Sequence, residues 1–142
     1  MIDAALLDAP CPCGRTDAKA RPLAYARCCG ALHQRFAATG RWDAPDAETL
    51  MRSRYSAFTL ELLDYLRATW HPDTRPATLE ANEPGLKWLG LQVKARAQQD
   101  AEHATVEFVA RSKLGGRAFR LHETSRFVRV DGQWHYLDGD LR

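Results

Sequence analysis

The chain has 142 residues, a formal net charge of +2 and 45% hydrophobic residues. That length suffices for one hydrophobic core with a small appendage, and no apolar run approaches the roughly 18 residues that a membrane span requires. Residues 1–8 are short and acidic, unlike an export signal, so we expect a cytoplasmic protein without membrane association.

All four cysteines lie close together in the sequence, as Cys11-Pro12-Cys13-Gly14 and as Cys28-Cys29-Gly30. Four thiolates complete the tetrahedral coordination of Zn²⁺ and leave no open position for water, so a zinc bound here would be structural. Gly14 permits a tight turn after the first pair. The alternatives are disulfides, which are rare in a reducing cytosol, and a redox site, which more naturally uses Cys-x-x-Cys.

His33 follows Cys29 by four residues and could replace one thiolate as the fourth ligand. A histidine at this place also suits the surface of a helix or a position next to the ligands rather than among them. The sequence therefore leaves Cys29 and His33 as competing candidates for the fourth position.

The segment around the cysteines is basic. Residues 9–42 contain six lysines and arginines and a single acid, a net charge of +5, which leaves −3 for the other residues. Such a segment suits docking to an acidic surface of a protein or to a nucleic acid. The same charge also occurs on segments that are merely solvated.

Two helical regions are predicted next. Residues 31–38 form a short helix that Thr39-Gly40 ends. A second helical region begins at Pro45-Asp46-Ala47-Glu48, with proline early and acids in the first turn, as the helix dipole prefers. Apolar residues at three- and four-residue spacing continue it to Leu66, and Thr59 is expected to break it and cap a second helix.

The helix should be over by His71, since Pro72 disfavours the helical conformation for the residue before it. Residues 73–85 then read as a linker, and the remainder as strands. Alternating apolar positions and glycine-containing turns predict an antiparallel meander, with strands at residues 89–97, 104–113, 117–130 and 133–138.

The third of these strands contains a polar irregularity. Strict alternation places Glu123 and Ser125 on the same face as Phe127 and two further apolar residues. A carboxylate on a core face is costly unless it is paired. The sequence favours a buried ion pair between Glu123 and an arginine, with Arg52, Arg54 and Arg126 available.

The alternative is that Glu123 lines a ligand cavity and acts as a general acid or base. The other candidates for such a cavity, as catalytic, anion-holding or lining residues, are His71, Arg52, Arg54, Trp70, Trp88, Ser125 and Tyr136.

The pattern Cys11-Pro12-Cys13-Gly14 with Tyr25-Ala26-Arg27-Cys28-Cys29-Gly30 resembles the SEC-C zinc motif, best known from the SecA translocation ATPase. It departs from that motif by a longer insert, Arg15 to Ala24, which is expected to form a loop. Downstream, a series of short segments resembles the YchJ family of bacterial proteins, among them Met51-Arg52-Ser53-Arg54-Tyr55, Tyr65-Leu66-Arg67-Ala68-Thr69-Trp70-His71-Pro72 and Trp134-His135-Tyr136-Leu137-Asp138-Gly139.

The resemblance implies an α+β protein: a zinc-binding module at residues 1–42, followed at residues 43–142 by a cone-shaped domain of helices and a curved antiparallel sheet. That domain is of the nuclear-transport-factor-two-like (NTF2-like), or SnoaL-like, kind. The resemblance implies a fold without an activity, because this cone hosts both enzymes and binding modules.

Two hypotheses of function follow. The first, favoured by the zinc motif and the charge asymmetry, is an interaction protein that docks through its basic zinc module and holds a small ligand or another protein in the cone. The second is a small-molecule hydrolase, isomerase or dehydratase that uses Glu123 in the cone. The oligomeric state is open between a monomer and a homodimer.

Overall fold

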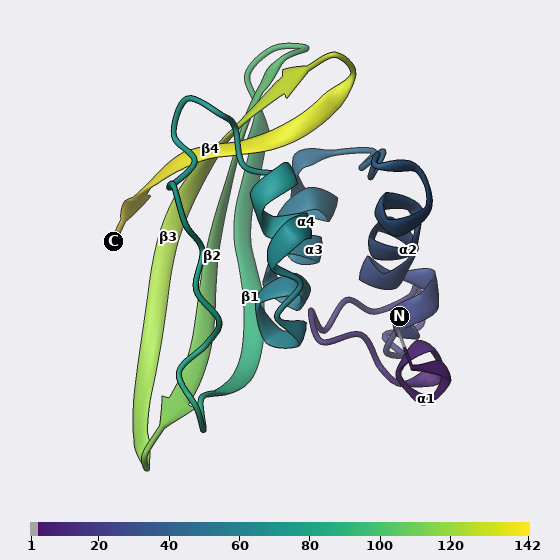
Figure 1. Cartoon of the computed structure of the whole chain (residues 1–142), viewed down its shortest axis with the longest axis vertical. Helices are drawn as coiled ribbons and strands as arrows, with labels where there is room; N and C mark the ends of the chain where they lie inside the picture. Colours follow the sequence, from purple (N-terminus) through teal and green to yellow (C-terminus); the bar gives the residue numbers. More distant parts are fainter. Residues whose placement is uncertain (1–2) are drawn as a thin grey trace.

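The computed structural model describes residues 3–142, so that Met1 and Ile2, part of the segment read as lacking an export signal, lie outside the described residues. It confirms the α+β class: helices pack on one face of a four-stranded antiparallel sheet with the strand order β1-β2-β3-β4 (Figure 1). In chain order the elements are α1 (Ala4–Asp8), the 3-10 helix η1 (Tyr25–Arg27), α2 (Cys29–Thr39), α3 (Ala47–Leu60), α4 (Leu63–Ala68), β1 (Lys87–Gln98), β2 (His103–Leu114), β3 (Arg117–Val130) and β4 (Gln133–Leu141).

The helices begin and end largely where local chemistry predicts. Gly40 ends α2 in the left-handed conformation, with φ of 78°. The Asp46 side chain caps α3 by accepting from the Thr49 amide at 2.7 Å. The expected break into two helices is confirmed, but Thr59 does not cap the second: α3 ends at Leu60, with Glu61 as its C-cap at a φ of 57°, and α4 starts without a side-chain cap. The Thr59 hydroxyl donates back to the Ser56 carbonyl.

The sheet is the predicted meander. The bounds of β3 match the expectation at both ends, and β2 and β4 extend only a few residues further than predicted. The start of β1 departs from simple alternation, because a bulge between Trp88 and Gly90 shifts the register. Leu89 therefore points outward, 57% exposed, while Trp88 packs inward.

One hydrophobic core joins the helices to the sheet, and a second, smaller cluster joins the cysteines to it. In the second cluster Cys11, Cys13 and Cys29 pack with Tyr55 of α3 and Ala110 of β2. The cysteines thus lie between α2, α3 and the sheet, while α1 lies on the side of the helices away from the sheet (Figure 1).

The predicted module boundary, between residues 42 and 43, falls inside the main core. Trp42 is 6% exposed and belongs to the core cluster. Its indole Nε1 donates to the Trp134 carbonyl on β4 at 2.9 Å. The cysteine segment and the sheet therefore form a continuous packed structure. Within residues 3–142 no helix is long and apolar enough to cross a membrane.

Candidate metal centre and the adjoining cavity

The insert between the two cysteine pairs folds as a closed hairpin that brings the pairs together. Antiparallel bridges join Pro10 to Ala24 and Thr16 to Pro22. The Cys11 amide donates to the Leu23 carbonyl at 2.9 Å. The expectation that the insert is a loop is correct, and its closed ends place the first cysteine pair opposite the start of α2.

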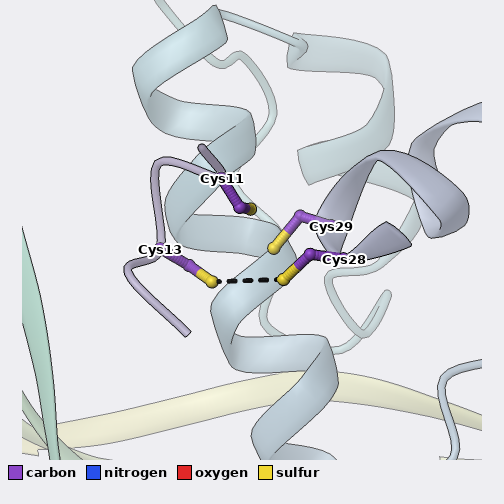
Figure 2. A group of neighbouring side chains, drawn as sticks. All are labelled: Cys11, Cys13, Cys28 and Cys29. Carbon is purple, nitrogen blue, oxygen red and sulfur yellow. Dashed lines mark hydrogen bonds between the residues drawn. The ribbon is translucent and has the colours of Figure 1, made fainter. Parts of the chain in front are cut away.

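All four sulfurs converge between this hairpin and the first turn of α2 (Figure 2). Every pair of the Sγ atoms of Cys11, Cys13, Cys28 and Cys29 lies within 4.8 Å, and the Cys13 and Cys28 sulfurs are 3.5 Å apart. All four are free thiols and three are buried. Gly14 makes the predicted turn, with φ of 75° and its amide donating to the Cys11 carbonyl.

This arrangement fits a tetrahedral metal ion. With metal–sulfur bonds of about 2.3 Å, the edge of a tetrahedron of sulfurs is about 3.8 Å, so only small movements separate the four sulfurs from coordination. Contact with the other thiols, Cys13 first, lowers the pKa of Cys11, whereas contact with Cys11 raises the pKa of Cys28 and of Cys29. Four thiolates this close need a cation to offset their charge.

His33 lies outside the sulfur group, and other partners engage both of its ring nitrogens. Nε2 lies 2.9 Å from the Ser53 carbonyl, which can only accept, so Nε2 carries the proton. Nδ1 therefore accepts from the Tyr25 hydroxyl. Burial lowers the pKa of His33 to about 4, so the ring is neutral. His33 holds α2 on α3, next to the ligands.

Arg52, expected in an ion pair with Glu123 or holding an anion, lies beside the cysteines instead. Its Nη1 donates to the Cys13 carbonyl at 3.1 Å and is 3.9 Å from the Cys13 sulfur. Its Nε donates to Glu48 at 2.8 Å, and Arg15 and Arg96 also pair with Glu48. Burial acts to raise the pKa of Glu48, but the three arginines outweigh it and the pKa lies below its usual value.

A cavity of about 360 Å³ lies between α3 and the sheet, at the small end of the size range of ligand sites. It shares a wall with the cysteine group, because Tyr55 and Ala110 contact both. Half of the residues that line it are aromatic: Tyr55, Phe58, Trp70, Trp88, Phe108, Phe127 and Tyr136.

Arg54 places a buried cation in this cavity. It is 5% exposed, and its Nη1 donates to the Leu66 carbonyl at 2.8 Å and to the Thr69 hydroxyl at 2.6 Å. The guanidinium carbon lies 5.0 Å from the centre of the Trp70 ring and 4.8 Å from that of Tyr136. Burial lowers the pKa of Arg54 to about 10, so it stays charged at neutral pH.

Glu123 lines the same cavity, and the ion pair that the sequence favoured is not formed. Its Oε2 accepts from the hydroxyls of Ser125 and Tyr136, and no arginine of residues 3–142 lies within 4.0 Å of it. Burial, followed by the nearby Glu123 charge, raises the pKa of Tyr136. Gly139 on β4 makes room for the carboxylate, because a Cβ there would collide with it.

The comparisons with known proteins agree with this architecture. Residues 46–139 match the family described as YchJ, middle NTF2-like domain. The chain belongs to the YchJ family. Among YchJ-family relatives, a UPF0225 protein of Bordetella parapertussis is 60% identical over 134 residues, which cover 94% of each chain. A UPF0225 protein of a Polaromonas species is 57% identical over 143 residues, 99% of this chain and 100% of the relative.

Two solved structures extend the likeness to the whole chain. The crystal structure of a SEC-C motif containing protein from Psychrobacter arcticus has a TM-score of 0.78 at 29% identity and covers 97% of this chain and 85% of that one. The solution structure of a SEC-C motif containing protein from Rhodopseudomonas palustris has a TM-score of 0.73 at 30% identity, with 93% and 98% covered.

The other candidate residues of this YchJ-family chain divide between the cavity and its surroundings. Trp70, Trp88, Ser125 and Tyr136 line the cavity. His71 does not: its Nδ1 accepts from the Asp73 amide, and its ring lies near His135 on another side of the fold.

The basic side chains of the cysteine segment are mostly exposed and partly paired. Arg21 pairs with Asp17, while Arg35 and Arg41 both pair with Asp43. Lys19 and Arg27 are exposed, and neither makes a salt bridge in the described part of the chain.

Two structural residues of the candidate metal centre were not predicted from the sequence. Glu48 was read as a first-turn acid, yet it anchors three arginines beside the cysteines. Gly30 was read as part of the motif alone, yet a Cβ there would come within 2.5 Å of the Tyr25 carbonyl. The sequence signal for Glu48 is its position three residues before Met51, which places both residues on the apolar side of the helix.

Proposed function

We propose that this chain binds a small organic molecule in the cavity between α3 and the sheet, and that a structural zinc ion on the four cysteines keeps the wall of that cavity in place. The observation that supports it most is a cavity lined by aromatic rings that contains the charged Arg54 and the carboxylate of Glu123, neither of which has an ion-pair partner within residues 3–142. Leaving the buried charge of Arg54 without an anionic partner is costly, and a ligand with a matching anionic group offsets that cost.

Zinc is the metal that suits the four-cysteine group best. Four thiolates in a buried tetrahedral set are typical of structural zinc, and they leave no place for a reactive water. The chemistry that the ion supplies is charge compensation of the thiolates. Arg52 adds a second positive charge, and Tyr25 and His33 pack the cysteine segment on α3.

The cavity proposal is tested with indole, which is apolar and matches the aromatic walls. We expect protein-observed NMR to show saturable shifts of the cavity residues, with a dissociation constant of about 1 mM for a ligand of this size. Leu121→Trp should abolish binding by filling the mouth of the cavity, where Leu121 is 39% exposed. Leu89→Trp, exposed outside the cavity, is the matched control and should bind normally. Binding that Leu121→Trp leaves unchanged would contradict the proposal.

Docking of an acidic macromolecule through the basic cysteine segment is a second proposal. It is supported by the exposure of five of the six basic side chains there, Lys19 and Arg27 among them. A double charge reversal, Lys19→Glu with Arg27→Glu, should then remove the salt-dependent retention of the chain on a heparin column. Arg117→Glu with Arg120→Glu, on the far sheet, is the control. Equal retention of both variants would exclude docking through this segment.

A further inference from the structure

We infer that the ligand of the cavity is a small carboxylic acid that carries an amine and an apolar body, such as an amino acid with an apolar side chain. This inference rests on the proposed function and names its ligand class. Two groups of opposite charge, Arg54 and Glu123, line the same cavity. Each keeps polar atoms that make no hydrogen bond to the protein within residues 3–142.

The free side of Arg54 is the one that recognises a carboxylate. Its protein acceptors use Nη1 alone, and Nε and Nη2 make no hydrogen bond within residues 3–142. These two nitrogens form one edge of the guanidinium plane, which matches the two oxygens of a carboxylate. In that part of the chain, the unpartnered side-chain polar atoms that are fully closed off are the indole nitrogens of Trp70 and Trp88. The two free nitrogens of Arg54 are not closed off in this way, and Arg54 lines the cavity, so we place its free edge toward the cavity.

Glu123 offers the complementary group. Both hydroxyl donors, from Ser125 and Tyr136, go to Oε2, so that Oε1 is free to accept. Arg54 stacks on the same Tyr136 ring whose hydroxyl contacts Glu123. A molecule with a carboxylate and an ammonium on the same carbon, as in an α-amino acid, can therefore meet both charges beside this ring.

The rest of the cavity wall determines the third part of the ligand, its apolar body. Phe58, Trp88, Phe108 and Phe127 leave little polar surface away from the two charges. A bare anion would be attracted by Arg54 and repelled by Glu123, and a bare cation the reverse. A ligand that carries both charges and an apolar body satisfies each part of the cavity.

The test compares L-phenylalanine with 3-phenylpropionate, which lacks the amine, and with 2-phenylethylamine, which lacks the carboxylate, by NMR titration. We expect L-phenylalanine to bind at least tenfold more tightly than either. Glu123→Gln should bring L-phenylalanine down to the affinity of 3-phenylpropionate. Arg54→Met should bring it down to that of 2-phenylethylamine.

Two further variants keep the test decisive. Arg54→Lys retains the charge if Arg54→Met fails to fold, and the loss of the two-nitrogen edge should still weaken L-phenylalanine about tenfold. Arg120→Met and Glu107→Gln, outside the cavity, are the matched controls and should bind as the natural chain does. Equal affinity for the three compounds, or no binding of any of them while indole binds, would overturn the ligand class and leave the cavity proposal standing. Failure of indole as well would overturn both.

Discussion

Removal of the proposed zinc ion is predicted to destabilise the whole fold rather than the cysteine segment alone. The cysteines share a cluster with Tyr55 of α3 and Ala110 of β2, and Tyr25 is fully buried between them and α2. Burial of a large apolar side chain contributes about 1.5–3 kcal/mol. Loosening Tyr25 and Tyr55 should therefore remove about 3–6 kcal/mol, a large share of the 5–15 kcal/mol typical of a domain.

The assay is urea unfolding of the zinc-loaded and chelated chain, followed both by far-UV circular dichroism and by tryptophan fluorescence. We expect both signals to shift together on chelation, because Trp88 of the sheet packs against the same cluster. Chelator should have no further effect on Cys13→Ser, which is the control. A separate early transition, with unfolding of the sheet unaffected, would refute this reasoning and favour an independent module at residues 1–42.

Two further predictions concern residues around the metal centre. Gly30→Ala should lower the free energy of unfolding by about 1–3 kcal/mol, as overpacking does, and weaken zinc binding in a competition titration, because the added Cβ would displace Tyr25. Gln34→Ala on the exposed side of α2 is the control. A Gly30→Ala variant as stable as the natural chain would contradict the packing described. Glu48→Gln should lower the free energy of unfolding by about 3 kcal/mol at pH 7. Because the pKa of Glu48 is lowered in the folded chain, the stabilisation by its ionised carboxylate is fully present above the unfolded pKa of about 4.3. It is lost as the pH falls below that value and through the folded pKa. Thermal melts at pH 7 and pH 3 should therefore differ less for Glu48→Gln than for the natural chain or for Glu80→Gln, and an unchanged pH dependence would argue against the arginine cluster.

The parts of the fold that depend on local chemistry could be predicted from the sequence. The alternation of apolar and polar residues along β3, together with the turns at its ends, predicted the bounds of this strand. The same alternation correctly placed Glu123 and Ser125 on its inner face. The cysteine spacing indicated a metal site, because few functions other than metal binding require four thiols within so short a segment. The bulge at Leu89 could not be predicted, since it depends on the pairing of β1 with β2.

The partners of the arginines could not be predicted for a different reason. An arginine side chain is long enough to reach several acids, and its sequence neighbours do not select among them. Arg52 turns toward Cys13 and Glu48, while Arg54, two residues further along α3, lies on another side of the helix over Trp70. The sequence proposed both for Glu123, and the structure assigns neither to an ion pair with it.

A crystal structure of the zinc-loaded chain grown with L-phenylalanine would test both proposed sites at once. We expect one tetrahedral metal ion on Cys11, Cys13, Cys28 and Cys29, and ligand density in the cavity with its carboxylate on Arg54 and its amine on Glu123. A metal-free cysteine group, or a closed cavity in which Arg54 pairs directly with Glu123, would contradict this expectation.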